Sequence, residues 1–381
     1  MKSPYVFTPG PTMVRENVLL ARSEKFTNPD LDLNFYDYYK ETCEKIGNIL
    51  GTKSDVRILS GEGILGLEAA CASLTEPLDN VLILDNGIFG EGFKDFVTLY
   101  GGIPTIYKSD RQKEIDIDDL EKFLKDNHDF KYATVVHCDT PSGVLNDIKR
   151  ICPLLKKYGI LTVVDSVAAM VGEPINVDEW QIDIALGGSQ KAFSAPPGLT
   201  IVSISEDAYK CMNNRKSPIV GFYCNLTIWR DYYEKKWFPY TMPISDIYGL
   251  RVATENILDE GLEKVHDRHR KIADATRKAL EEYGFNLYLK SGYSSTVTVV
   301  EPPKGIEVNK LIKQMREKYN VLIAGSFGYL ENKVIRIGHM GENAKLEHIS
   351  YVLNTMELAL EDLGYSNNKS IINEFNKYIK E

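Results

Sequence analysis

The sequence lacks the features that mark several classes of protein. No apolar run approaches the roughly 20 residues of a membrane-spanning helix, which argues against a membrane partner. Lys and Arg number 45 against 54 Asp and Glu, for a formal net charge of −9, whereas a nucleic-acid partner favours a basic face. No apolar stretch follows the N-terminus as in a secretory signal. The cysteines include no C-x-x-C pair, which favours reduced core thiols in a cytoplasmic protein: Cys43, Cys71, Cys138, Cys152, Cys211 and Cys224.

Short apolar, β-branched runs alternate with helical stretches through the first half of the chain. A chain of 381 residues is too long for one ordinary core, so two domains are expected. The expected strands are 56–59, 81–84, 132–136, 160–164, 182–186 and 199–203, with helices at 65–74 and 153–158. This alternation predicts an α/β fold with a mostly parallel sheet that helices cover on both faces.

The pattern changes after a long expected helix over residues 247–283, in which Gly261 marks a break. Strands are then expected at 295–300, 321–324 and 334–337, helices at 308–319 and 346–363, and a polar tail at 366–381. We therefore expect an N-terminal arm (residues 1–20), a large domain (21–255) and a smaller α+β C-terminal domain (256–381).

A glycine-rich loop lies between the first expected strand and helix. Gly61, Gly63 and Gly66 match G-x-G-x-x-G, and Asp85 closes the next strand. Taken alone this arrangement favours a dinucleotide such as NAD and hence a dehydrogenase. The glycines, however, only let backbone N–H groups at a helix start approach a phosphate. The loop therefore indicates a phosphate site, or a tight turn that binds nothing, without naming the cofactor.

Lys191 stands in a segment suited to holding a lysine in one place. Small residues precede it, and the rigid turn Pro196–Gly198 follows. Partial desolvation there lowers the pKa of a lysine toward the neutral amine that forms a Schiff base. Upstream, Asp165 ends a very apolar strand, where open α/β sheets place ligands. A carboxylate there can keep a pyridine nitrogen protonated, so the pair favours pyridoxal phosphate (PLP) as the phosphate-bearing cofactor.

Six segments of the chain resemble those of class V aminotransferases, especially the alanine–glyoxylate/serine–pyruvate branch. They are Thr8–Pro11, Ser60–Glu68, Asn86–Gly90, Val164–Val167, Gly188–Ala192 and Arg336–Gly338. The resemblance runs from about residue 5 to about residue 360. It implies a fold-type I PLP enzyme, usually a homodimer with active sites at the subunit interface.

The resemblance also implies roles for individual residues. Lys191 corresponds to the Schiff-base lysine, which also moves a proton, and Asp165 to the partner of the pyridinium nitrogen. The other implied cofactor contacts are Glu62, Gly63, Ile64 and Gln190 at the phosphate, Phe89 and Val167 on the ring faces, Thr140 at the ring oxygen, and Thr241 with Tyr240 from the neighbouring subunit. Arg336, with Gly10 nearby, corresponds to the clamp for the substrate carboxylate.

Two positions depart from the family pattern. Ile64 stands where a polar residue is usual, and Phe238 stands where a tyrosine commonly reaches the phosphate, although Tyr240 is close enough to substitute. The stretch 26–39 is aromatic-rich and acidic and lies where the family lines the substrate entrance, so donor preference is open.

The expected reaction is transamination between alanine or serine and glyoxylate or pyruvate, in a ping-pong sequence through pyridoxamine phosphate. Three alternatives stay open: a PLP-dependent lyase or desulfurase of the same fold, an NAD-dependent dehydrogenase that uses the glycine loop, and a catalytically silent PLP-fold protein. No metal site is expected. His266 and His269 share a helix face, but the charges around them indicate a solvated helix.

Overall fold

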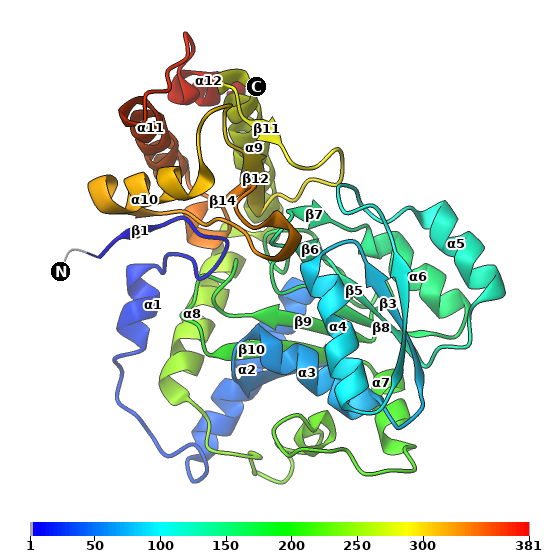
Figure 1. Ribbon diagram of the computed structural model, residues 1–381. Coiled ribbons are helices and arrows are strands. Elements are labelled where there is room, and N and C mark those ends of the chain that lie inside the picture. Colours follow the sequence, from blue (N-terminus) through cyan, green and yellow to red (C-terminus); the bar gives the residue numbers. More distant parts are fainter. Residues whose placement is uncertain (1–2, 381) are drawn as a thin grey trace.

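A seven-stranded sheet forms the centre of the larger domain (Figure 1). The protein is known from a computed structural model, which describes residues 3–380. The strand order is β2-β10-β9-β8-β5-β3-β4, and only β10 runs against the others. The bounds are β2 Asp55–Ser60, β3 Asn80–Asp85, β4 Ile103–Lys108, β5 Tyr132–Val136, β8 Leu161–Asp165, β9 Ile184–Gly188 and β10 Leu199–Ile204.

Helices cover this sheet on both faces. Strands β5, β9 and β10 are buried at every position, as expected for a sheet with two covered faces and near-continuous apolar strands. The helices of this part are α1 Glu16–Ala21, α2 Leu33–Leu50, α3 Gly63–Leu74, α4 Ile88–Leu99, α5 Ile117–Asp126, α6 Ile148–Lys157, α7 Glu206–Asn213 and α8 Ile244–Glu260, with a 3₁₀ turn at Leu226–Trp229. A short hairpin pairs β6 Cys138–Asp139 with β7 Val144–Leu145.

The C-terminal part is a smaller unit at the top of Figure 1, built on a three-stranded antiparallel sheet. Its strands, in the order β11-β12-β14, are Asn286–Leu287, Val297–Glu301 and Ile335–Gly338. Its helices are α9 Leu262–Tyr283, α10 Val308–Tyr319, α11 Leu346–Asp362 and α12 Ile371–Tyr378, with 3₁₀ turns at Gly328–Leu330 and Gly341–Asn343. The expected strand at 321–324 is only β13, Val321–Leu322, and it pairs with β1, Tyr5–Val6, from the N-terminal arm.

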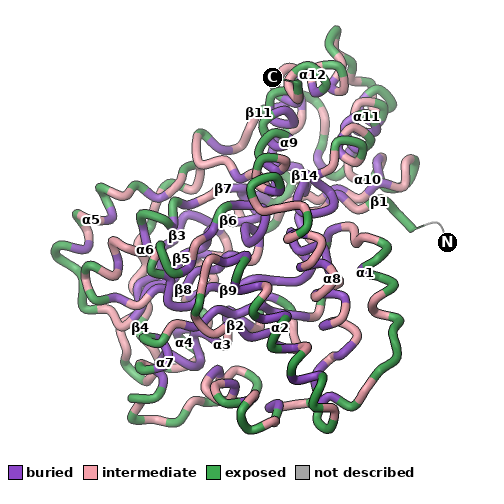
Figure 2. Tube along the Cα trace, turned by 180° about the vertical axis from the view of Figure 1, so that it is seen from behind, coloured by how far each residue is buried: buried purple, intermediate pink, exposed green. Residues whose placement is uncertain are grey.

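Two hydrophobic cores correspond to these two parts. The larger core surrounds the seven-stranded sheet and extends to Ile257 and Val265, while the second packs α9 to α12 around the small sheet and takes in Phe7 of the arm. Figure 2 shows the buried trace concentrated in both places. The expected boundary after residue 255 falls inside α8, whose Ile257 still packs in the larger core. We therefore propose that the boundary lies within the first turns of α9, after Val265.

Two details around the long helix bear on the sequence expectations. Gly261, at φ 87°, separates α8 from α9, which is the break expected there. The solvated-helix expectation is wrong for His269, which is fully buried; its Nε2 accepts a hydrogen bond from the Gly341 N–H at 2.8 Å. The reason is that charged neighbours on α9 cover only its outer face, while His269 lies on the inner one.

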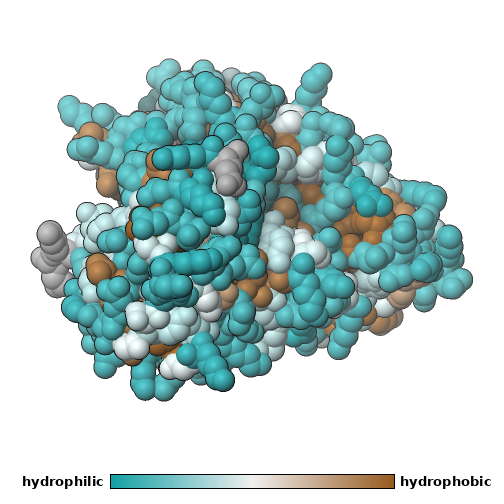
Figure 3. Space-filling view, turned by 90° about the horizontal axis from the view of Figure 1, so that it is seen from above, coloured by the Kyte–Doolittle hydropathy of each residue, from teal (hydrophilic) through white to brown (hydrophobic). Residues whose placement is uncertain are grey.

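The face of the molecule seen from above is predominantly hydrophilic, with its widest hydrophobic area in the right half of the picture (Figure 3). Among the described residues, no helix combines the length and the apolar character needed to cross a membrane.

Candidate active site

A cavity of about 340 Å³ opens beside the carboxyl ends of β8 and β9 and the start of α3. Ten expected site residues line it: Gly10, Glu62, Gly63, Ile64, Phe89, Thr140, Asp165, Val167, Gln190 and Lys191. The strand order explains this convergence, because loops that leave the same edge of a parallel sheet meet there. Sequence reasoning missed five other lining residues: Pro11, Leu67, Cys138, Ala168 and Pro197.

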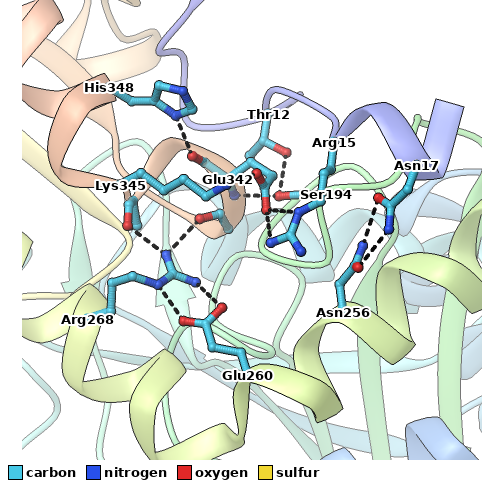
Figure 4. Close-up of polar contacts among 12 residues, drawn as sticks. Thr12, Arg15, Asn17, Ser194, Asn256, Glu260, Arg268, Glu342, Lys345 and His348 are labelled. Atoms are coloured by element: carbon cyan, nitrogen blue, oxygen red, sulfur yellow. Dashed lines mark hydrogen bonds and ion pairs between the residues drawn. The ribbon is translucent and has the colours of Figure 1, made fainter.

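Lys191 lies in the loop after β9, which contacts from three parts of the chain hold in place. The Thr12 hydroxyl donates to the Lys191 carbonyl at 3.2 Å, and the Ser194 N–H donates to the same carbonyl at 2.8 Å. The Ser194 hydroxyl in turn accepts from the Glu342 N–H at 2.8 Å, and Glu342 pairs with Arg15 at 2.6 Å (Figure 4). These contacts therefore link the N-terminal arm, the lysine loop and the smaller domain next to Lys191.

The arm also touches the lysine side chain itself. The Lys191 ammonium donates to the Pro9 carbonyl. Gly10 has φ 96°, and a Cβ at this position would lie 2.5 Å from Lys191 Cδ. Glycine is therefore required at position 10 on both conformational and steric grounds.

The charges of Lys191 and Asp165 are both weakened by the surroundings. Burial, together with the nearby positive charge of Arg336, lowers the pKa of Lys191 to about 8. Burial raises the pKa of Asp165 to about 7, although its carboxylate accepts the Val167 N–H at 2.9 Å. The site therefore holds an amine that is about half neutral at pH 8, beside a carboxyl group that is only partly ionised at pH 7.

The start of α3 is the glycine-rich loop of the sequence. Gly63 packs so closely that a Cβ would lie 2.8 Å from the Val167 side chain. Glu62 is the N-cap of α3: its Oε1 accepts the Ile64 N–H at 3.2 Å. Its Oε2 accepts from Gln190 Nε2 at 3.2 Å, while Gln190 Oε1 is buried without a hydrogen-bond partner. The carboxylate thus takes a helix N–H that would otherwise be offered to a phosphate.

Phe89 reaches the cavity from the first turn of α4. Its N–H donates to Asp139 Oδ1 at 2.9 Å, and its ring meets Phe327 edge-on at 6.1 Å between centroids. Asp139 is fully buried and so fixes the start of α4 from the adjacent hairpin strand β6. The ring of Phe89 is half-buried and borders the cavity.

Arg336 approaches from β14 without lining the cavity. Its Nε donates to the Gly325 carbonyl at 2.6 Å and its Nη1 to the Thr140 carbonyl at 3.2 Å. Burial lowers the pKa of Arg336 to about 10, which leaves it cationic at neutral pH, and none of the ion pairs found within residues 3–380 includes it. It is a guanidinium held by two carbonyl oxygens, close enough to Lys191 to lower the pKa of that lysine and near enough to Asp139 to feel its negative charge.

Several other residues expected near Arg336 or the phosphate lie outside the cavity. Gly338 leaves room for the N-terminal arm, because a Cβ there would lie 2.2 Å from the Thr8 carbonyl oxygen. Phe238 is a core residue that stacks on Tyr36 at 4.4 Å. Tyr240 accepts from the Ser60 N–H at 3.2 Å and Thr241 is exposed, so neither lines the cavity of its own chain. Their expected contact across a subunit interface stays a prediction.

Two alternative chemistries lack support in the geometry. Asp85, which a dinucleotide would need, does not line the cavity; it accepts the Gly87 N–H and lies 3.7 Å from Arg111. Cys138 does line the cavity, as its place just after β5 could have indicated. Burial raises the pKa of its thiol to about 12, so it is not the thiolate that a desulfurase uses.

Comparison with known proteins decides the family. The family model described as aminotransferase class-V matches residues 4–327. The chain belongs to the class V aminotransferases. Among curated relatives of this aminotransferase, an uncharacterized aminotransferase of Methanocaldococcus jannaschii is 36% identical over 94% of the chain and 92% of the relative. The pyridoxamine–pyruvate transaminase of Mesorhizobium japonicum is 33% identical over 94% and 91%.

A solved structure agrees with this assignment. The ureidoglycine–glyoxylate aminotransferase of Bacillus subtilis superposes with a TM-score of 0.96 at 29% identity, covering 100% of this chain and 99% of that one. The protein is thus an aminotransferase with the fold-type I architecture. The names of these relatives leave the donor and acceptor of the present chain open.

Proposed function

We propose that this aminotransferase moves an amino group between a small amino acid and a small 2-oxo acid with a pyridoxal cofactor, PLP in its family, at Lys191. The observation that carries the proposal is the convergence of Lys191 and Asp165 on one cavity, with Arg336 beside it. Two of the alternatives have less support: a dinucleotide enzyme would need a free Asp85, and a desulfurase would need a thiolate at a residue such as Cys138.

The residues fit the ring of such a cofactor. Asp165 is a buried carboxyl group whose raised pKa would fall again beside a protonated ring nitrogen. Phe89 and Val167 supply apolar surface to the same cavity, and Thr140 a hydroxyl. The phosphate fits less well, since at the start of α3 it would meet the Glu62 carboxylate.

When bound, the cofactor supplies an aldehyde for the amino group and a ring that accepts the electron pair released at the α-carbon. The chain supplies the proton handling and the orientation. Lys191 Nζ, with a pKa near 8, takes a proton from one carbon and returns it to another. Asp165 keeps the ring nitrogen protonated, which makes the ring a better electron acceptor. The Pro9 carbonyl holds Nζ while it is not engaged.

Arg336 would bind the substrate carboxylate. Its fork geometry suits two parallel hydrogen bonds to a carboxylate, and Gly325 and Thr140 already fix the plane of the guanidinium. The cavity is small and largely apolar near Leu67 and Pro197. This favours alanine or serine as donor and glyoxylate or pyruvate as acceptor, in line with the branch that the sequence resembles.

We also propose a homodimer in the cytoplasm. Tyr240 and Thr241 lie outside their own cavity, as the resemblance to interface-sharing enzymes implies for residues that serve the neighbouring site. The cysteines among residues 3–380 are free thiols, which suits a reducing compartment.

Covalent trapping tests the proposal. The protein is incubated with pyridoxal or PLP, reduced with borohydride, digested and mapped by mass spectrometry. We expect one dominant modified peptide, that of Lys191, and its loss in Lys191→Ala. Lys210→Ala, which removes an exposed lysine of α7, is the matched control and should leave the label in place. Labelling spread over surface lysines, with no preference for Lys191, would refute the proposal.

A further inference from the structure

The side of the cavity at α3 carries the wrong charge for a phosphate. Glu62 caps the helix with its own carboxylate through the Ile64 N–H. A bound phosphate would have to displace this carboxylate or lie against it. At contact distance the repulsion between the two anions costs at least about a factor of ten in affinity, even in high dielectric.

The cavity offers little positive charge in compensation. Of the residues that line it, Lys191 is the one cation, whereas Glu62 and Asp165 are both acidic. Lys191 belongs to the opposite, β9 side, and it is the group that must react with the aldehyde. The charge of Glu62 also reaches the two reactive groups: it adds to the rise in the pKa of Asp165 and opposes the lowering of the pKa of Lys191, after the larger effect of burial on each.

The hydrogen-bonding groups at this side call for a donor on the ligand. Gln190 Nε2 donates to Glu62, which fixes the orientation of the amide, because the reverse would set two acceptors against each other. Gln190 Oε1 is then a buried acceptor without a partner. A phosphate dianion brings only acceptor oxygens, so it leaves Gln190 Oε1 without a partner and sets its charge against the Glu62 carboxylate. A hydroxymethyl group brings the O–H that either oxygen can accept.

We infer that Glu62 and Gln190 select an unphosphorylated ring, so that pyridoxamine or pyridoxal binds as an exchangeable substrate rather than as a resident phosphorylated cofactor. This inference rests on the proposed function, because it concerns the ligand of the same site. Without a phosphate anchor the ring leaves after each turnover, and pyridoxamine is itself the amino donor for the 2-oxo acid.

The reaction balances without any further reagent. Pyridoxamine and a 2-oxo acid condense with loss of one water, and the hydrolysis that releases the products takes one water up. The bond between nitrogen and the aminomethyl carbon breaks, and nitrogen remains bonded to C2 of the oxo acid. The aminomethyl carbon is oxidised to the aldehyde by two electrons, and C2 is reduced by the same two. Lys191 carries the proton from the first carbon to the second.

Binding of two unreactive ligands separates charge selection from catalysis. Pyridoxine and pyridoxine 5′-phosphate lack the reactive amine and aldehyde and differ only in the phosphate, so calorimetry reports affinity alone. We expect the wild-type protein to bind pyridoxine at least about tenfold more tightly than its phosphate. Glu62→Gln should bind pyridoxine 5′-phosphate more tightly and pyridoxine more weakly than the wild type does. The ratio of the two affinities should therefore become smaller or reverse.

A second acidic residue of α3 provides the matched control. Glu68 accepts the Tyr100 hydroxyl at 2.8 Å and does not line the cavity, so Glu68→Gln should keep the wild-type ratio. A wild-type preference for the phosphate ester, or a ratio that Glu62→Gln leaves unchanged, would overturn the inference. If PLP modifies Lys191 and pyridoxal does not, the inference fails while the proposed function stands. If neither aldehyde modifies Lys191, both fail.

Discussion

The two sides of the cavity differ in the ligand groups that they can bind. On the β8–β9 side, Asp165 is buried and Lys191 is half-buried, and their pKa values lie close together, at about 7 and about 8. On the α3 side, Glu62 is exposed and binds a helix N–H, and Gln190 keeps an unmatched acceptor. The β8–β9 side can bind any pyridoxal ring, since its groups contact the ring nitrogen and the carbon that carries the amine or aldehyde. The α3 side determines whether the ring can carry a phosphate, and its negative charge disfavours one.

The largest expected effect is on the β9 side. Lys191→Ala should lower the rate of amino transfer by about 10²–10⁴-fold, the usual worth of a positioned proton carrier. The measurement is single-turnover formation of aldehyde from the bound amine after a 2-oxo acid is added. Lys210→Ala should keep the wild-type rate. If Lys191→Ala kept more than about a tenth of the wild-type rate, Lys191 would not be the proton carrier. The assignment of the chemistry to the β8–β9 side of the cavity would then be wrong.

Arg336→Ala should give the next largest effect. Removing one partner of a buried charge pair costs about 2–5 kcal/mol, so KM should rise for every amino acid and 2-oxo acid alike. Steady-state kinetics across a donor and acceptor panel measures this, with Arg316→Ala, an exposed arginine of α10, as the control. A loss confined to one donor would contradict the role of Arg336 as a general carboxylate clamp.

Asp165→Asn should have a smaller effect, on stability, in the protein without ligand. A carboxyl group whose pKa is raised on folding stabilises the fold below about pH 4 and loses that contribution as pH rises through about 7. At pH 8 the variant should therefore be more stable, by about 1–3 kcal/mol, and at pH 4 the difference should vanish. Thermal unfolding at both pH values measures this.

The control for Asp165→Asn is Asp118→Asn, at the exposed start of α5. It should leave the unfolding temperature unchanged at either pH. If Asp165→Asn were less stable than the wild type at pH 8, the buried carboxylate would be well compensated in the free protein. The conclusion that the pKa values of Asp165 and Lys191 lie close together would then be wrong.

Local sequence patterns predicted much of this molecule. Helix α10 has the predicted bounds 308–319, and α11 ends one residue before its predicted end at 363, because long amphipathic segments with clear ends carry their own signal. The antiparallel direction of β10 was not predictable, since an apolar run reads alike in either direction. The strand predicted at 321–324 was too long, because its length depends on its partner β1, which pairs only with Val321–Leu322 and lies more than 300 residues away.

The site shows the same limit more sharply. Asp165 and Lys191 were predictable because strand ends mark the ligand edge of an α/β sheet. The glycine loop predicted a phosphate, and its backbone does form the expected helix start. What the pattern cannot show is the direction of the Glu62 side chain, which turns back onto the Ile64 N–H. A residue in a variable position of the motif thereby changes the charge that the site accepts.

One competition experiment tests the contrast between the two sides most directly. The wild-type protein is exposed to equimolar pyridoxal and PLP and reduced once with borohydride. It is then digested, and the mass of the Lys191 peptide is measured by mass spectrometry. We predict that the adduct without phosphate dominates by at least about tenfold, because Lys191 reacts with either aldehyde and Glu62 admits one. Dominance of the phosphorylated adduct would contradict this account.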